Sequence, residues 1–242
     1  MNKAIKEQTS TICVQICSNM EWQSVLDIQY PDPSAVCSYP QGRYFIQQLY
    51  GAHLVFFHSG IGKTRAGAAC QYAIDHWRPG IILVMGTCGG VAEEIKLLDI
   101  IVANRTGQYD CIERMGEVKN LFYEPFTTDI DNSWIGLESI ANAREGLVAT
   151  ADQDLNHEML EVLRSEKVLC ADWESGAIAY ICKLNQVPCC VVRGISDKPG
   201  TDSNAEVQQG LDYRHNTPII MKKMLAEVLP ELIRSHVARS AT

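Results

Sequence analysis

The feature that most constrains the fold is an uninterrupted apolar run that ends in a glycine-rich segment. Residues Ile81 to Met85 are all apolar, and Gly86-Thr87-Cys88-Gly89-Gly90 follows directly. A continuous apolar run of strand length is typical of a strand covered on both faces of a sheet. Because glycine leaves the backbone uncovered, the end of this strand is expected to allow close approach of a ligand.

Other apolar runs of strand length alternate with longer amphipathic segments. Strands are expected over residues 11–17, 44–49, 53–58, 99–103, 146–150 and 188–192, and helices from residue 19, from 59–62 to 77, and over 155–165, 173–184 and 218–236. The alternation shows no linker or repeat, which predicts one α/β domain over residues 1–242 with helices on both faces of a mostly parallel sheet. We expect residues 1–10 to be a loose N-terminal tail. Residues 105–133 are expected to form loops at a ligand mouth or a subunit interface.

Charge and cysteine usage exclude several classes of protein. The formal net charge of −8 argues against nonspecific binding of nucleic acid. The first residues are polar, and no apolar run is long enough to cross a membrane, so we expect a cytoplasmic protein without a membrane partner. The 10 cysteines form no CxxC pair and do not cluster with the 6 histidines, so we expect neither disulfides nor a metal site.

The segment Gly60-Ile61-Gly62-Lys63-Thr64 has the composition of a phosphate-binding loop but lacks its spacing. Phe57 stands where the Walker pattern requires glycine, and Arg65 stands where a dinucleotide fingerprint requires a small residue. Two interpretations remain. The segment is either a glycine-rich turn that approaches an anion or water at a helix N-terminus, or only a tight turn.

Two later segments place carboxylates beside small residues at expected sheet edges. They are Asp172-Trp173-Glu174-Ser175-Gly176-Ala177 and Arg193-Gly194-Ile195-Ser196-Asp197. Ligands of open α/β sheets bind beyond the carboxyl ends of strands, so both segments are candidates for a site. Each also has a structural alternative: Asp172 as a helix N-cap, Asp197 as part of the turn that follows it, and Arg193 as a buried charge paired with an acid.

Taken in this order, residues 85–90, 172–177 and 193–197 resemble the nucleoside phosphorylase and nucleosidase superfamily. They are most similar to its methylthioadenosine/S-adenosylhomocysteine nucleosidase branch. The resemblance implies a three-layer nucleoside phosphorylase-like α/β fold with a mixed central β-sheet flanked by helices. It also implies hydrolysis of the N-glycosidic bond of a purine nucleoside to free base and sugar, as in methionine salvage. No metal or organic cofactor is expected, and the chain is expected to form a homodimer or a higher homo-oligomer.

The resemblance also assigns roles to individual residues. Glu174 would hold the ribose hydroxyls, Asp197 would protonate the departing base, and Ser196 would orient Asp197. Arg193 would lie near the attacking water. The remaining candidates for substrate binding are Trp173, which replaces a common methionine, and Thr87, Cys88, Gly89, Met20, Asp152 and Gln153.

The residue that activates water has two candidates in the segment Cys17-Ser18-Asn19-Met20-Glu21-Trp22-Gln23. Matching of methionines with the family places Gln23 at the family's glutamate position, whereas Glu21 is the carboxylate within one helical turn. A glutamine amide can position water but cannot accept its proton. We therefore assign the role to Glu21, with a helix-stabilising carboxylate as the alternative.

The nucleophile and the base are less constrained. Val84 stands where one class of phosphorylase has an arginine for phosphate, which favours water as the nucleophile, although Arg43, Lys63 and Arg65 are candidates to compensate. A phosphate-dependent purine or uridine nucleoside phosphorylase and a non-catalytic nucleoside-binding protein are the alternatives. The segment Asp152-Gln153-Asp154-Leu155 lacks the aromatic residue that stacks on adenine in the family. The residues that could replace it are Tyr109, Phe122, Tyr123 and Phe126.

Overall fold

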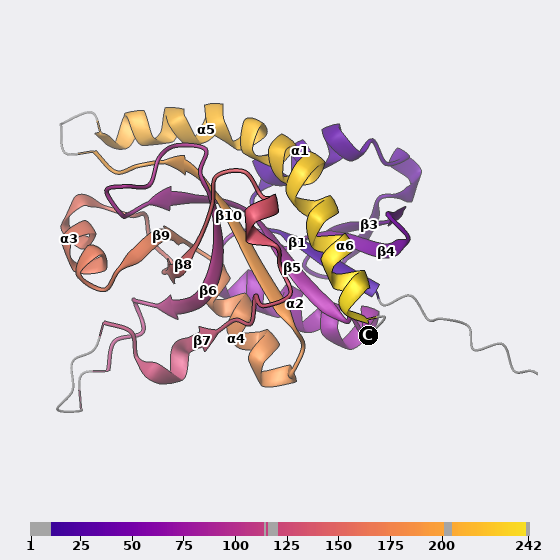
Figure 1. The fold of residues 1–242 in the computed structure, drawn as a ribbon, viewed down its shortest axis with the longest axis horizontal. Coiled ribbons are helices and arrows are strands. Elements are labelled where there is room, and N and C mark those ends of the chain that lie inside the picture. The colour runs from indigo at the N-terminus through magenta and orange to yellow at the C-terminus, as the bar shows by residue number, and fades with distance from the viewer. Residues whose placement is uncertain (1–10, 114, 116–120, 201–204, 241–242) are drawn as a thin grey trace, which may run out of the picture.

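The computed structural model describes residues 11–113, 115, 121–200 and 205–240. The strands are β1 Thr11–Ile16, β2 Cys37–Tyr39, β3 Gly42–Leu49, β4 Ala52–His58, β5 Ile81–Gly90, β6 Ile100–Gln108, β7 Thr127–Asp129, β8 Ala143–Thr150, β9 Val168–Asp172 and β10 Cys189–Asp197. The helices are α1 Asn19–Gln29, α2 Lys63–Trp77, α3 His157–Ser165, α4 Ser175–Asn185, α5 Ala205–Lys223 and α6 Leu229–Ser240 (Figure 1). The expected N-terminal tail, residues 1–10, lies outside the described residues.

The sheet is mixed and closes on itself around its central strand. β5 pairs in parallel with β1 and β10, and its last residues, Gly89 and Gly90, pair antiparallel with Ala171 and Cys170 of β9. From β10 the hydrogen-bonded order runs through β6, β8 and β9 back to β5, while β1, β4, β3 and β2 extend the other edge. The carboxyl ends of β5 and β10 therefore meet the end of β9 in a confined region.

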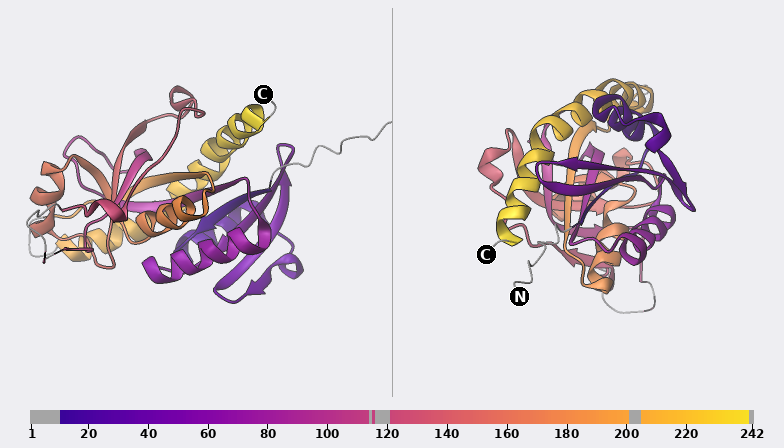
Figure 2. Two further views of the ribbon diagram at one scale, coloured as in Figure 1. Left: turned by 90° about the horizontal axis from the view of Figure 1, so that it is seen from below. Right: turned by 90° about the vertical axis from the view of Figure 1, so that its right-hand side faces the viewer.

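Helices cover both faces of this sheet. α1, α5 and α6 pack over one apolar core that contains Trp22, Val192 and Ile220, and α2 and α4 pack over a second core that contains Val84 and Ile178. Figure 2 shows α2 and α4 on one side of the strands and the C-terminal helices on the other. The expected mixed α/β fold with flanking helices is confirmed.

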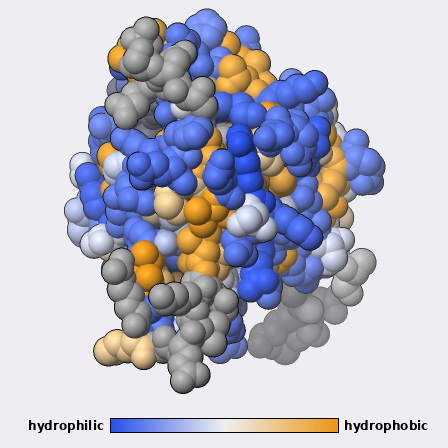
Figure 3. Space-filling model, turned by 90° about the vertical axis from the view of Figure 1, so that its left-hand side faces the viewer, coloured by the Kyte–Doolittle hydropathy of each residue, from blue (hydrophilic) through white to orange (hydrophobic). Residues whose placement is uncertain are grey.

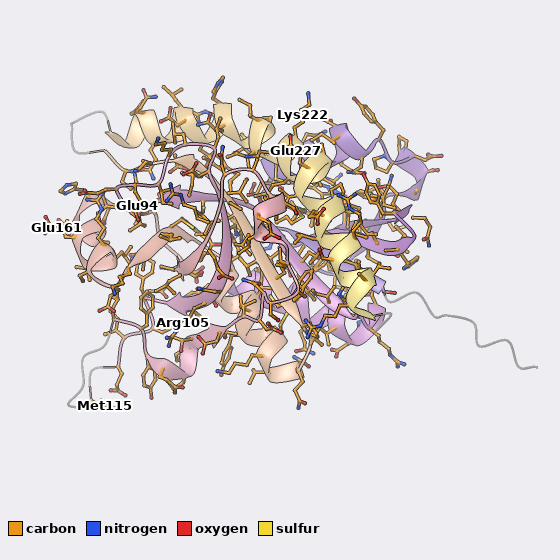
Figure 4. The ribbon with its side chains drawn as sticks, viewed as in Figure 1. Glu94, Arg105, Met115, Glu161, Lys222 and Glu227 are labelled. Carbon is orange, nitrogen blue, oxygen red and sulfur yellow. The ribbon has the colours of Figure 1, made fainter. Side chains whose placement is uncertain are left out.

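One end of the molecule carries α3 and the loops that follow the strands. Glu94, just after β5, and Glu161, on α3, lie at this end, away from Lys222 and Glu227 on the C-terminal helical segment (Figure 4). Among the described residues, no helix combines the length and apolar character that a bilayer crossing requires.

The main differences from the sequence prediction lie in the second half of the chain. The C-terminal helix, expected to begin at Pro218, begins at Ala205, and Pro218 lies inside it. Proline is unfavourable inside a helix because it has no backbone N–H to donate. Ile220 and Met221, which follow Pro218 on the helix, are fully buried against the sheet. Their tertiary packing therefore overrides the local preference.

Other differences concern strands. β9 was not predicted, and the three-residue strands β2 and β7 are too short to show a periodic pattern. β6 extends to Gln108 and β7 begins at Thr127, so the expectation that residues 105–133 are loops is wrong at both ends. β10 also runs through Ser196 and Asp197 instead of ending before them.

The contact between α5 and β10 depends on a glycine. An ideal Cβ at Gly194 would lie 2.2 Å from Cγ2 of Ile220. Gly194→Ala should therefore force α5 away from the sheet and lower the free energy of unfolding by about 1–3 kcal/mol, measured by urea denaturation.

Gly67→Ala is the matched control, because a Cβ at this buried helical position would meet Cγ1 of Ile181 at an ordinary 3.6 Å. Its stability should be unchanged or should rise by up to about 1 kcal/mol, since alanine favours a helix. A Gly194→Ala variant as stable as the wild type would contradict this account of the packing.

Candidate active site

A cavity of about 1040 Å³ opens at the end of the molecule where β5, β9 and β10 finish. Its lining is shared between distant parts of the chain: Ser18, Glu21, Ile61, Thr87, Cys88, Gly89, Tyr109, residues 153–158, residues 171–174, Ser196, Asp197, Pro199, Gly200, Gln209, Gly210 and Tyr213. Figure 3 shows the side of the molecule at which α3 lies, where the surface is mainly hydrophilic with apolar residues in a band near the middle. The volume is sufficient for a nucleoside-sized ligand.

Glu21 is fixed at the inner side of this cavity by the start of α1. Ser18 and Glu21 form a capping box, in which the Ser18 N–H donates to Glu21 Oε2 at 2.9 Å and the Glu21 N–H donates to Ser18 Oγ at 3.2 Å. Glu21 Oε1 accepts hydrogen bonds from the Thr87 N–H at 2.6 Å and from Thr87 Oγ1 at 2.8 Å. These donors hold a buried carboxylate beside the end of β5.

Gln23, the alternative to Glu21, lies elsewhere. Its side chain is exposed and donates a hydrogen bond to Asp27 Oδ1 at 2.7 Å on the outer face of α1. The structure therefore brings Glu21, not Gln23, to the cavity.

Arg193 lies behind the cavity wall in a buried ion pair. Its Nε is 2.8 Å from Asp172 Oδ2 and donates to Ser175 Oγ at 2.9 Å, and its Nη2 is 3.7 Å from Glu174 Oε2. The arginine side chain is 1% exposed and is not among the lining residues. The structure shows the buried charge paired with acids, and Gly86 places Arg193 Nη1 and Glu21 Oε1 next to the same backbone position, so the role of Arg193 near the attacking water stays a prediction.

Asp172 is more than a helix cap. Its Oδ1 accepts from the Thr150 hydroxyl at 2.7 Å and from the backbone N–H groups of Glu174 and Ser175, while its Oδ2 pairs with Arg193. The residue therefore joins β8, the start of α4 and β10 through one carboxylate.

Glu174 lines the cavity and also pairs with Arg193 behind it. Its Oε1 accepts a hydrogen bond from the Gly62 N–H at 3.0 Å, so the glycine-rich turn before α2 contacts a carboxylate of the chain itself. Burial raises the pKa of the Glu174 carboxyl, and Arg193 opposes this shift. The residue is placed to accept hydrogen bonds from polar groups of a ligand.

Asp197 lies at the end of β10 with both oxygens engaged. Oδ1 accepts from Ser196 Oγ at 2.5 Å, and Oδ2 accepts from Gln209 Nε2 at 2.8 Å. Burial raises the pKa of Asp197, and these two hydrogen bonds oppose the shift. An ideal Cβ at Gly89 would lie 3.4 Å from Asp197 Oδ2, so the glycine keeps open the space beside the carboxyl group.

The other predicted binding residues divide into two groups. Thr87, Cys88, Gly89, Trp173 and Gln153 line the cavity, as expected. Burial raises the pKa of the Cys88 thiol, which disfavours the thiolate form that a nucleophile requires.

Met20 and Asp152 are not among the residues that line the cavity in this chain, so their roles in substrate binding stay predictions. Asp152 Oδ1 accepts from the Lys63 N–H at 2.7 Å and caps the start of α2. Met20 lies in the first turn of α1, one position before Glu21, where its carbonyl accepts from Ser24 Oγ. Adjacent residues of a helix point in different directions, so the side chain of Met20 does not follow that of Glu21 toward the cavity.

Of the aromatic candidates, only Tyr109 lines the cavity. Phe122 packs against Gly107 of β6, where an added Cβ would meet its ring at 2.4 Å. The rings of Tyr123 and Phe126 contact each other in a tilted arrangement, and Phe126 also contacts Tyr180 of α4. The rings that line the cavity and could stack on a base are those of Tyr109, Trp173, Tyr213 and His157.

Sequence reasoning expects the C-terminal helix to contribute to the pocket for the 5′ substituent, but it does not identify the residues of α5 that do so. Gln209 and Tyr213 line the cavity, and the Tyr213 hydroxyl donates to Ser18 Oγ at 3.0 Å. Burial raises the pKa of Tyr213 to about 12, so the hydroxyl remains a donor. No sequence signal marked these residues, because the helix was expected to begin only at Pro218.

The cavity is strongly acidic. Its lining includes six carboxylic acids: Glu21, Asp154, Glu158, Asp172, Glu174 and Asp197. Among the described lining residues there is no lysine or arginine. Lys63 pairs with Asp110, and Arg65 donates to the Gln41 carbonyl, so neither supplies a cation to the site.

Comparisons with known proteins identify a family. The family model described as "Phosphorylase superfamily" matches residues 20–234. A 5′-methylthioadenosine/S-adenosylhomocysteine nucleosidase of Geobacillus sp. WCH70 is 27% identical over 207 residues, covering 77% of this chain and 84% of its own. The corresponding nucleosidase of Tolumonas auensis is 26% identical over 240 residues, covering 93% and 97%.

Solved structures share the fold at lower identity. The 5′-methylthioadenosine/S-adenosylhomocysteine nucleosidase of Helicobacter pylori with butyl-thio-DADMe-Immucillin-A superposes with a TM-score of 0.78 at 21% identity, covering 94% of this chain and 100% of that one. The futalosine hydrolase of the same organism gives 0.77 at 20% identity, covering 93% and 98%.

The buried ion pair yields a stability prediction. Arg193→Met leaves the Asp172 and Glu174 carboxylates buried without their cation, so we expect a loss of about 3–5 kcal/mol in the free energy of unfolding. Adding Asp172→Asn should recover part of this loss, with a coupling of about 0.5–3 kcal/mol in a double-mutant cycle measured by chemical denaturation.

The matched control is Arg234→Met, which removes an ion pair with Glu231 whose arginine is 58% exposed. It should cost at most about 1 kcal/mol. Additive effects of Arg193→Met and Asp172→Asn would contradict the pairing described above.

Proposed function

The chain belongs to the phosphorylase superfamily, and on this premise we propose that it is a nucleosidase that hydrolyses the N-glycosidic bond of a purine nucleoside. The observation that carries the proposal is the arrangement of three carboxylic acids around one cavity whose described lining residues include no lysine or arginine. Asp197 lies at the end of β10, Glu174 at the start of α4 and Glu21 at the start of α1. The named relatives support the same reaction class.

Asp197 acts on the leaving group. A purine that departs as an anion is a poor leaving group, so cleavage requires a proton on a ring nitrogen. Because burial raises the pKa of Asp197, the group retains a proton at a higher pH than an exposed aspartate does. The proton passes from the carboxyl oxygen to the base nitrogen while the electron pair of the C1′–N bond moves to the base.

Glu174 and Glu21 act on the sugar and on water. One carboxylate that accepts hydrogen bonds from both ribose hydroxyls binds more strongly as the sugar becomes cationic, because charge-assisted hydrogen bonds strengthen. Water attacks C1′ from the side of Glu21, and Glu21 accepts its proton. Thr87, which donates to Glu21 Oε1 through N–H and hydroxyl, fixes the direction of that carboxylate.

The acidic lining favours water over phosphate as the nucleophile. A phosphate dianion would enter a cavity with six carboxylic acids and, among its described lining residues, no lysine or arginine. Phosphate sites in proteins are typically built from arginine, lysine or helix N-termini. Neutral water meets no such repulsion.

As substrates we propose purine nucleosides whose 5′ substituent is uncharged or zwitterionic, with methylthioadenosine and S-adenosylhomocysteine as the first candidates. The printed names of the Geobacillus and Tolumonas relatives support these two compounds. This assignment would place the chain in methionine salvage. Surfaces for stacking of the base are offered by the rings of Tyr109, Trp173, Tyr213 and His157.

The reaction is tested by base release. The protein is incubated in phosphate-free buffer with methylthioadenosine, S-adenosylhomocysteine, adenosine, inosine, guanosine and uridine, and free base is separated by chromatography. We expect purine and free sugar to appear, and Asp197→Asn to lower kcat by about 10²–10⁴-fold. Asp129→Asn, whose side chain is 85% exposed, is the matched control and should retain full activity.

Two outcomes would contradict the proposal. Release only in the presence of phosphate, with sugar 1-phosphate as product, would show a phosphorylase. Tight nucleoside binding without release would show a binding protein of the same fold.

The charge of the cavity gives a second prediction. Two like charges about 8 Å apart repel by about 2 kcal/mol at an effective dielectric constant of about 20. We therefore expect kcat/KM for adenosine 5′-monophosphate to be about tenfold or more below that for adenosine. The difference should shrink as salt is raised, since ions screen the repulsion. Equal use of nucleotide and nucleoside would show that the lining acids do not select against anions.

A further inference from the structure

Gln209 is a polar residue of α5 whose amide reaches the buried acid of the site. Its Nε2 donates to Asp197 Oδ2 at 2.8 Å, and its side chain lines the cavity. The adjacent Gln208 is exposed and donates instead to Asp212 Oδ1, four residues further along the same helix. The two glutamines share a helix and a chemical type, but only one contacts Asp197.

The surroundings of Asp197 show why this contact matters. Burial raises its pKa, and the acidic groups that act on it, Asp212 from α5 and Asp154 from the loop after β8, raise it further. The influences that oppose the shift are the hydrogen bonds from Ser196 and Gln209. The carboxyl group is thus balanced between environments that favour its acid form and two donors that favour its carboxylate.

We propose that Gln209 is a positioning residue for the leaving-group step: its amide fixes the Asp197 carboxyl plane and stabilises the carboxylate that remains after the proton has moved to the base. The inference rests on the proposed function. In the step, the O–H bond of Asp197 breaks, an N–H bond of the base forms, and the negative charge stays on the carboxylate. Hydrogen bonds to this carboxylate strengthen as its charge develops, which lowers the barrier.

The geometry leaves room for the base while this hydrogen bond persists. Ser196 occupies Oδ1 and Gln209 occupies one lone pair of Oδ2. The side toward Gly89 has no Cβ, and one placed there would lie 3.4 Å from Oδ2 and 3.3 Å from Leu155 Cδ2. Because Gly89 has no side chain on this side of Oδ2, a ring nitrogen of a base that lies in the cavity can approach the carboxyl group while Gln209 keeps its hydrogen bond.

The test measures the ionisation of Asp197 directly. The side-chain carboxyl carbon of Asp197 is followed by NMR across a pH titration, with Asp197→Asn used for its assignment. Gln209→Leu removes the donor at similar volume, so the titration midpoint should rise by about one pH unit, because a hydrogen bond to the charged form is lost. Gln209→Glu replaces the donor with an acid and should raise the midpoint further. Gln208→Leu is the matched control and should leave it unchanged.

Activity provides a second readout on the same variants. In Gln209→Leu, kcat should fall about tenfold to a hundredfold, and the alkaline limb of kcat/KM should move to higher pH together with the carboxyl midpoint. A fall in kcat with an unmoved midpoint would overturn the proposal, because it would show a purely structural role.

A third measurement needs no variant of Gln209. In the wild type, the side-chain amide resonances of Gln209 should titrate with the Asp197 carboxyl group, and in Asp197→Asn this titration should vanish. Amide resonances that do not follow Asp197 would also overturn the proposal. If no nucleoside is cleaved by the wild type, the proposed function fails by itself, whereas the two NMR titrations still decide whether Gln209 acts on Asp197.

Discussion

The buried charge of Arg193 is the constraint on which the rest of the site depends. A guanidinium group that is 1% exposed requires carboxylate partners, and the chain supplies them from the end of β9 and the start of α4. Gly86 makes this possible, since a Cβ there would lie 2.4 Å from Arg193 Nη1 and 2.6 Å from Glu21 Oε1. Strands β5, β9 and β10 and the starts of helices α1 and α4 thereby meet around the Arg193 side chain, and the cavity forms beside it.

The charges are arranged in two layers. The guanidinium group of Arg193 is buried behind the wall of the cavity, while the carboxylic acids Glu21, Glu174 and Asp197 line the cavity itself. An environment of this kind stabilises positive charge that develops on a sugar more than it stabilises a bound anion. In the proposed reaction, the acidic lining that disfavours phosphate would therefore also favour an oxocarbenium-like transition state, so the choice of nucleophile and the stabilisation of the sugar would have one electrostatic origin.

Much of this arrangement could be predicted from the sequence, because strand ends with small residues and acids are local patterns. Short segments of the sequence predict β5 and its glycine-rich end. They also indicate Arg193 as a buried charge that pairs with an acid, and Glu174 and Asp197 as candidate site residues. Asp152 and Met20 could not be placed, because their directions depend on contacts with α2 and on the rotation of α1. Glu21 was separated from Gln23 only by the capping box and by Thr87, a residue 66 positions away. The site residues of α5 were hidden because Pro218, a local helix breaker, lies inside the helix.

α5 also connects the two sides of the cavity. Gln209 contacts the acid at the end of β10, and Tyr213, one turn later, contacts the Ser18 cap of the helix that carries Glu21. Each residue of an α-helix turns by about 100°. A single-residue insertion or deletion between Tyr213 and the buried Ile220, which anchors the helix on the sheet, would therefore rotate both side chains away from their partners at once. Such a change would remove two contacts on opposite sides of the cavity, so this part of α5 should tolerate substitution at its exposed positions far better than a change in length.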